Sequence, residues 1–195
     1  MTYSIIGSGN VGSALARQFA RGGIAVGIAN TRGPTSIEAL QKELAGYVTA
    51  LSLQDAVKAD VVILAIPFSA HKAVARAAAQ WTDKIVVDAM NTYGVPLEEL
   101  DGKPSSVMVA SAFTGASVVK SLNQLPAKLL ASDPVEQGGR RVMFLAGDDV
   151  RAVTSVAKLV GDLGFAPIPL GTLIGVGTLL DKGGALVLQN LIKQG

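Results

Sequence analysis

The chain has 195 residues, 49% of them hydrophobic, which is enough to bury the core of one domain with at most a small appendage. Its 17 Lys and Arg residues nearly balance 15 Asp and Glu residues, and no run of five or more like charges suggests a nucleic-acid-binding arm. The absence of cysteine excludes disulfides, thiolate nucleophiles, zinc ribbons and iron–sulfur clusters.

Short apolar runs alternate with helical patterns along the chain, which is typical of βαβ units and predicts an α/β fold with a doubly wound, mostly parallel sheet. The predicted strands lie at residues 3–6, 24–29, 47–51, 61–66, 85–89, around 118–119 and at 142–146. The predicted helices cover residues 11–21, a segment from 35 to about 46, a short stretch after 52, an Ala-rich stretch after 69, and residues 149–163.

Two of these helices have capping signals in the sequence. Thr35 and Glu38 have the spacing of a capping box, and Ser52 with Asp55 predicts the N-terminus of the next helix. The run Val61–Ile66 is apolar without alternation, as expected for a parallel strand covered on both faces, and it predicts the centre of the sheet.

The segment Ser105–Ala112 is ambiguous. Its Val-Met-Val triplet suits a strand, whereas its place in the alternation requires a helix. We favour the helix.

The first strand is followed by the glycine motif Gly7-Ser8-Gly9-Asn10-Val11-Gly12. Such a motif is common by chance and can be a simple tight turn, but here it lies between a strand and a helix, as a dinucleotide-binding fingerprint requires. Gly7 would permit the turn, Gly9 would let the backbone approach a pyrophosphate, and Gly12 would let helix and strand pack closely. A P-loop is disfavoured because Ser13 stands where that motif needs lysine.

The end of the second strand indicates which dinucleotide binds. Sites specific for NAD usually place an Asp or Glu there, whereas this chain has Asn30-Thr31-Arg32. A carboxylate would repel a 2′-phosphate, and Arg32 can pair with one while Asn30 and Thr31 donate hydrogen bonds. The sequence therefore favours NADP(H), although Arg32 also fits a solvated loop position.

Several motifs extend the comparison beyond the glycines: "IIGSGNVGSALA", "IANTRG", "VVILAIPF", "KIVVDAMN", "VVKSLNQLPA" and "LAGDD". Together they resemble the coenzyme F420-dependent NADP oxidoreductase family, which transfers hydride between NADP(H) and a deazaflavin and is related to the reductase domain of membrane metalloreductases. The resemblance implies that Ile66-Pro67-Phe68 lie along the dinucleotide near its nicotinamide side and that Ala89-Met90-Asn91 surround the reactive ring. It also implies that Leu122 and Asn123 lie beside the reactive ring.

The same resemblance implies that the Gly-rich tail "GTLIGVGTLLDKGGALVLQNLIKQG" is helical and packs between the subunits of a homodimer. One position departs from the family pattern. The characterised deazaflavin reductases have a histidine where this chain has Asn123, which leaves the identity of the acceptor open.

Candidate catalytic groups are few. Hydride transfer between two rings needs alignment and a dry site but no acid or base, whereas a carbonyl or imine substrate needs a proton donor. His71, the only histidine, is a candidate, although an exposed position on the first helical turn is the more ordinary interpretation. Tyr93 suits either a proton donor or a pocket cap. Lys120 and Asn123 do not make a convincing dehydrogenase pair, and Lys120 is expected to face solvent.

The sequence lacks the residue patterns of metal-dependent and serine hydrolases. The chain has no His-Glu-x-x-His, no clustered metal ligands and no Gly-x-Ser-x-Gly elbow, so we expect no metal site and no serine hydrolase. The acid pairs Glu98-Glu99 and Asp148-Asp149 are interpreted as structural.

The sequence therefore predicts a Rossmann NADP-binding domain over residues 1–170 and a C-terminal helical tail over 171–195. The expected function is hydride transfer between NADP(H) and a small-molecule redox partner, a deazaflavin or a flavin, by a homodimer. A carbonyl or imine reductase and a non-catalytic NADPH sensor are the alternatives. With neither a signal-peptide pattern nor an apolar run long enough to span a membrane, and with no basic patch, we expect a cytoplasmic protein without membrane or nucleic-acid partners.

Overall fold

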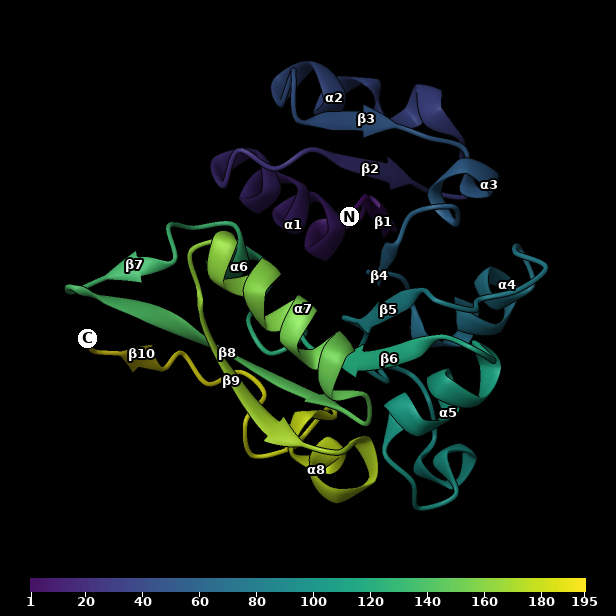
Figure 1. Cartoon of the computed structure of the whole chain (residues 1–195), viewed down its shortest axis with the longest axis vertical. Helices are drawn as coiled ribbons and strands as arrows, with labels where there is room; N and C mark the ends of the chain where they lie inside the picture. The colour runs from purple at the N-terminus through teal and green to yellow at the C-terminus, as the bar shows by residue number, and fades with distance from the viewer.

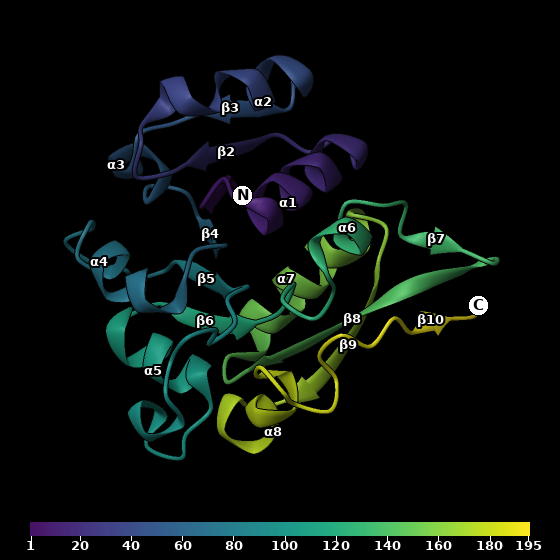
Figure 2. The ribbon, with the colours of Figure 1, turned by 180° about the vertical axis from the view of Figure 1, so that it is seen from behind.

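The computed structural model describes residues 1–195, apart from the side chain at position 97, and shows a sheet flanked by helices on both faces (Figures 1 and 2). The strands are β1 Tyr3–Ile6, β2 Val26–Ala29, β3 Val48–Ala50, β4 Val61–Leu64, β5 Ile85–Asp88, β6 Ser117–Lys120, β7 Val135–Glu136, β8 Gly139–Gly147, β9 Ala166–Gly171 and β10 Ile192–Lys193. The α-helices are α1 Asn10–Arg21, α2 Glu38–Glu43, α3 Leu53–Ala56, α4 His71–Ala75, α5 Ser105–Ala112, α6 Ala127–Leu130, α7 Val150–Asp162 and α8 Leu173–Leu180. Three 3₁₀ turns complete the chain: η1 Pro34–Ile37, η2 Phe68–Ala70 and η3 Leu97–Leu100.

Six strands form the parallel part of the sheet, in the order β3-β2-β1-β4-β5-β6. This is the strand order of a Rossmann fold, and it confirms the predicted doubly wound α/β class. The predicted centre is also confirmed, because β4 pairs with β1 and β5 and all four of its residues are buried. β8 runs antiparallel to β6 and extends the sheet.

The strands divide their side chains between two hydrophobic clusters, one on each face of the sheet, as the two-residue period of a strand requires. Ile5 and Ile63 join the cluster under α1 and α7, which includes Phe19 and Val156. Ile6 and Val62 face the opposite way, toward α4, α5 and α8. Both faces are therefore covered, which is why these strands read as continuous apolar runs.

Of the two helix N-caps predicted from the sequence, the structure confirms one and contradicts the other. The Ser52 cap is confirmed, since its Oγ accepts a hydrogen bond from the Asp55 amide at 3.1 Å. The Thr35–Glu38 capping box is wrong. Pro34 starts the 3₁₀ turn η1 directly after Gly33, so Thr35 lies inside a helical turn and no side chain caps it. The following helix, α2, ends at Glu43, before the expected position near residue 46.

The helix favoured over Ser105–Ala112 is confirmed as α5, and the Asp149 N-cap precedes α7. The Ala-rich helix expected after residue 69 is short, because η2 occupies Phe68–Ala70 and α4 covers only five residues.

The C-terminal tail is less helical than expected. α8 ends at Leu180, after which Asp181 is extended and Gly183 has a left-handed φ of 84°, so the glycines stop the helix. The last strand, β10, pairs antiparallel with β8. Val187, in the segment that joins α8 to β10, is buried. The tail thus folds back onto the sheet of its own chain. In the part of the chain that the structure describes, no helix has both the length and the apolar character to cross a membrane.

Candidate functional site

A groove of about 300 Å³ lies where the chain leaves β1, β4 and β5. These three strands are parallel neighbours, so their carboxyl ends meet at the same edge of the sheet, where open α/β sheets bind ligands. The structure brings most of the predicted cofactor-binding residues together here. The lining consists of Gly9, Asn10, Val11, Ala65, Ile66, Pro67, Ala89, Met90, Asn91 and Tyr93.

The three motif glycines have distinct surroundings. Gly7 has a left-handed φ of 112°, and a Cβ there would lie 2.1 Å from the Ala65 carbonyl oxygen. A Cβ on Gly12 would lie 1.8 Å from the Gly7 oxygen, so helix and turn touch at this point. Gly9 is different, because a Cβ there would meet no atom within 4 Å and would project into open space.

Helix α1 begins immediately after Gly9, and no side chain caps it. The amides of its first turn, with the positive end of the helix dipole, therefore face the groove without a protein partner from a cap. This is the arrangement by which helix N-termini bind phosphate groups.

Asn30 ties the end of β2 to the glycine turn. Its Nδ2 donates to Ser8 Oγ at 2.6 Å and to Ser36 Oγ at 2.8 Å, while its Oδ1 accepts from the Arg32 amide at 2.9 Å. Thr31 and the Arg32 side chain are exposed beside this anchor. Sequence reasoning missed Ser36, since no motif marks it and only the folded loop brings it to Asn30.

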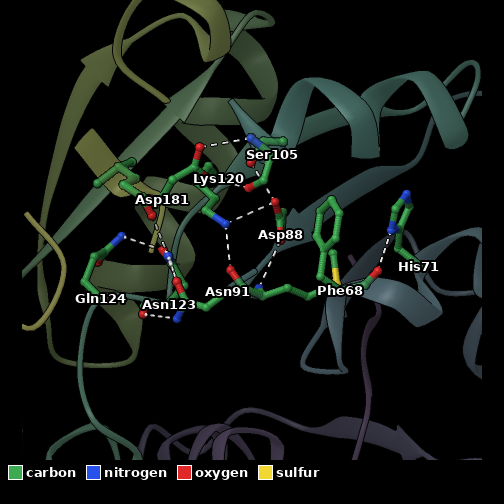
Figure 3. A network of polar contacts seen from close by, with 12 residues as sticks. Phe68, His71, Asp88, Asn91, Ser105, Lys120, Asn123, Gln124 and Asp181 are labelled. Atoms are coloured by element: carbon green, nitrogen blue, oxygen red, sulfur yellow. Dashed lines mark hydrogen bonds and ion pairs between the residues drawn. The ribbon is translucent and has the colours of Figure 1, made fainter. Parts of the chain in front are cut away.

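Behind the groove wall lies a buried ion pair, shown at the centre of Figure 3. Lys120 and Asp88 are 1% and 0% exposed, with Nζ 3.2 Å from Asp88 Oδ2. The prediction that Lys120 faces solvent is wrong. Because β5 and β6 are parallel and in register at these two residues, the last side chain of each strand meets the other at the covered edge. The sequence signal that could have predicted this ion pair is the position of Asp88 and Lys120 as the last residues of two neighbouring parallel strands.

Asn91 and Asn123 are joined by two hydrogen bonds (Figure 3). Asn91 Nδ2 donates to the Asn123 carbonyl and Asn123 Nδ2 donates to Asn91 Oδ1, each at 3.0 Å. Asn123 Nδ2 also donates to the Leu180 carbonyl at 2.7 Å, which links the groove to the end of α8. Leu122 just before Asn123 is buried with a left-handed φ of 64°, a strained conformation of the kind found at functional sites. Of the two candidate asparagines, Asn91 lines the groove and Asn123 supports it.

His71 is buried, with 2% of its surface exposed, so the expectation of an exposed histidine is wrong. The turn η2 folds the ring inward against Phe68, with ring centroids 4.6 Å apart, and Nδ1 donates to the Phe68 carbonyl at 2.5 Å. Nε2 has no hydrogen-bond partner among the described residues. Neither Phe68 nor His71 is among the groove-lining residues, although both were candidates.

Tyr93 lies at the mouth of the groove. The residue is 64% exposed, and Lys182 Nζ from the tail lies 5.3 Å from the ring centroid. This placement matches a pocket cap, and Tyr93 is the one titratable side chain among the lining residues. A larger hollow of about 530 Å³ lies between α4, η3 and α5, but it contains none of the predicted site residues.

Residues 2–92 match the family described as "NADP oxidoreductase coenzyme F420-dependent". The rat metalloreductase STEAP3 is 29% identical over 171 residues, which are 87% of this chain and 33% of that protein. The chain thus spans about a third of the length of this curated relative.

Two solved structures are similar over nearly their whole lengths. The hypothetical protein SMa0349 from Sinorhizobium meliloti is 43% identical, with 100% of this chain and 96% of that chain covered and a TM-score of 0.95. An Arthrobacter sp. FB24 protein, to which F420-dependent NADP reductase activity has been attributed, is 28% identical, with coverages of 92% and 90% and a TM-score of 0.76. Residues 2–92, the part of the chain that carries the glycine motif and β1 to β5, thus match the coenzyme F420-dependent NADP oxidoreductase family, a family of NADP-dependent oxidoreductases.

Proposed function

We propose that this chain binds NADP(H) in the groove and transfers hydride between the nicotinamide and a flat redox partner of the deazaflavin or flavin type. The observation that carries the proposal is the convergence of the open side of Gly9, the uncapped start of α1 and the β4 and β5 loops on one groove. The family match supports the same cofactor.

In this proposal each part of the groove holds one part of the cofactor. The pyrophosphate lies on the turn from Gly7 to Gly12, where the first amides of α1 donate to it. The 2′-phosphate lies beside Thr31 and Arg32, whose backbone is oriented by Asn30. The nicotinamide lies against the remaining lining residues, which are Ile66, Pro67, Ala89, Met90 and Asn91.

When bound, NADPH would supply the hydride from its dihydronicotinamide ring. The chain's residues would provide position and a dry wall. Ile66, Pro67 and Met90 exclude water from one side, and the Asn91 amide, held by Asn123, orients the ring by hydrogen bonding.

The groove favours the reductase of a flat acceptor over the carbonyl or imine alternative. A carbonyl or imine substrate needs a proton donor, and His71 lies outside the lining while Tyr93 is exposed at the mouth. Hydride transfer between two rings has no such requirement. The alternative of a non-catalytic NADPH sensor requires the same NADPH-binding groove. Only a measurement of catalytic turnover distinguishes it from the reductase.

We also infer that the chain acts as a homodimer through its tail. Apolar side chains of α8 and the segment after it are exposed in the single chain, which supports a protein contact there. They are Ile174, Leu179, Leu188 and Leu191, between 40% and 65% exposed.

Turnover with defined acceptors tests the proposal. The purified protein is mixed with NADPH and, in separate assays, a deazaflavin, FMN or a ferric chelate, and NADPH oxidation is followed by absorbance. We expect turnover with at least one of them. Tight NADPH binding without turnover would refute the reductase and support the sensor, whereas turnover only with a cyclic imine or a ketone would support the second alternative.

A further inference from the structure

The Asp88–Lys120 ion pair is the most completely buried pair of opposite charges in the described part of the chain. Removing two charges from water costs several kcal/mol per ion, and such a pair is often no more stabilising than apolar side chains of the same volume. Global stability alone is therefore a weak explanation for a lysine and an aspartate at this position.

The two side chains hold one residue from both sides. Asp88 Oδ1 accepts a hydrogen bond from the Met90 amide at 3.0 Å, and Lys120 Nζ donates to the Met90 carbonyl at 2.7 Å. Both backbone polar groups of Met90 are thus bonded to members of the ion pair. Because Met90 stands between Ala89 and Asn91 in the groove wall, this clamp fixes the peptide units on either side of it.

A third contact fixes the clamp itself. Ser106 Oγ on α5 donates to Asp88 Oδ2 at 2.6 Å, which orients the carboxylate so that its other oxygen faces Met90. The next residue, Asn91, is held through its side chain by Asn123. The Met90–Asn91 peptide is therefore restrained by the ion pair, and the side-chain amide of Asn91 is restrained by Asn123 (Figure 3).

We propose that Asp88 and Lys120 are positioning residues that hold the Met90–Asn91 wall in the geometry that aligns the nicotinamide. The inference rests on the proposed function, because it assigns the pair a role toward the ring end of the bound dinucleotide. The phosphate end lies on the Gly7–Gly12 turn, which makes no hydrogen bond to the pair. Loss of the clamp should thus affect the ring end and spare the phosphate end.

The test uses the double variant Asp88→Asn/Lys120→Met. It removes both charges together, so neither is left buried without its partner, as it would be in a single variant. The bond to the Met90 carbonyl is lost, and only a neutral amide is left for the Met90 N–H. The matched control is Asp162→Asn/Lys158→Met, which removes an exposed ion pair on α7 with an N–O distance of 2.6 Å.

Binding is measured by calorimetry with two ligands, NADPH and ADP-ribose 2′-phosphate, which has the same phosphates but no nicotinamide. For the clamp variant we expect NADPH affinity to fall by roughly tenfold, the effect of losing one well-placed polar interaction. Affinity for ADP-ribose 2′-phosphate should stay within about twofold of the wild type. With an acceptor that the wild type reduces, kcat should fall by up to about 100-fold, because misplacement of reacting groups by about 1 Å has effects of this size. The control should match the wild type in every respect.

Unchanged NADPH affinity and kcat in a folded clamp variant would overturn the inference. An equal loss for both ligands, or an unfolded double variant, would also overturn it, because the pair would then serve the fold as a whole. If the wild type itself fails to bind NADPH, the proposed function falls and the inference falls with it. The wild-type titration therefore separates the two failures.

Discussion

Gly9 and Gly12 stand three residues apart in one turn but differ in what a side chain would meet. A methyl group at Gly12 would lie 1.8 Å from the Gly7 oxygen, whereas one at Gly9 would enter open space. We expect Gly12→Ala to destabilise the fold and lower the melting temperature. Gly9→Ala should leave the melting temperature near that of the wild type and weaken NADPH binding by at least about tenfold, because the methyl group would occupy the space of the pyrophosphate.

The measurements are thermal unfolding and NADPH titration of both variants. Gly12→Ala should lose stability, whereas Gly9→Ala should lose NADPH affinity. A Gly9→Ala protein that binds NADPH as tightly as the wild type would contradict the placement of the pyrophosphate.

Arg32 is exposed at the end of β2, with its backbone amide bonded to Asn30 Oδ1. A charged hydrogen bond to a 2′-phosphate contributes about 1.5 to 3 kcal/mol, or roughly 10- to 100-fold in affinity. We expect Arg32→Ala to weaken NADPH binding by this factor and to leave NADH binding nearly unchanged, as measured by calorimetry. Arg151→Ala, at another exposed arginine, is the control. Equal losses for both dinucleotides would argue against the 2′-phosphate assignment.

Helix α7 depends on its N-cap, Asp149. Hydrogen bonds from the Ala152 amide, the Ser117 hydroxyl and the Arg151 amide hold the pKa of the Asp149 carboxyl below its usual range. A lowered pKa in the folded state means that the stabilisation is complete above the unfolded-state pKa, about 4 for aspartate. It is lost as the pH falls through the lower folded-state pKa.

Asn at position 149 would keep a capping oxygen but would not titrate. We therefore expect Asp149→Asn to be less stable than the wild type at pH 7 and the difference to shrink as the pH falls below about 4. Urea unfolding of both proteins across this range is the measurement. A difference that is independent of pH would show that the charge of Asp149 does not stabilise the helix.

The elements that sequence reasoning found are those with a strong periodic pattern, such as β1, α1, β4 and α7. It missed β9, whose sequence contains Pro167 and Pro169 and therefore argues against a strand. β9 pairs with β8 only, and a strand with a free edge tolerates proline because half of its backbone groups need no partner. It also missed β7 and β10, two residues each, whose pairing with β8 depends on tertiary position rather than on local pattern.

The residues of the candidate site also fall into those that the sequence pattern predicted and those that depend on tertiary structure. The glycine turn and the segments 66–67 and 89–91 were predictable, because the rule that ligands bind at the carboxyl ends of parallel strands places them together. The contacts of Ser36 with Asn30, and of Asn123 with the Leu180 carbonyl, were not predictable, since each joins segments through loop geometry that no motif encodes. His71 was misplaced because the 3₁₀ turn before α4 rotates its ring into the core.

At the level of the whole molecule, the tail folds onto its own sheet and still exposes apolar residues on α8. We expect the protein to sediment as a dimer and Ile174→Asp to shift it toward the monomer, because the charge would be buried in the contact. Analytical ultracentrifugation checks this, with Val150→Asp as the control at an exposed apolar residue on α7. A monomeric wild type, or a dimer that Ile174→Asp leaves intact, would contradict the proposed tail contact.

The central claim is that the groove is an NADP(H) site, and calorimetric titration of the purified wild-type chain with NADPH and with NADH tests it most directly. We predict one NADPH bound per chain, with an affinity at least about tenfold higher than that for NADH. Equal affinities, or no binding of NADPH, would contradict it.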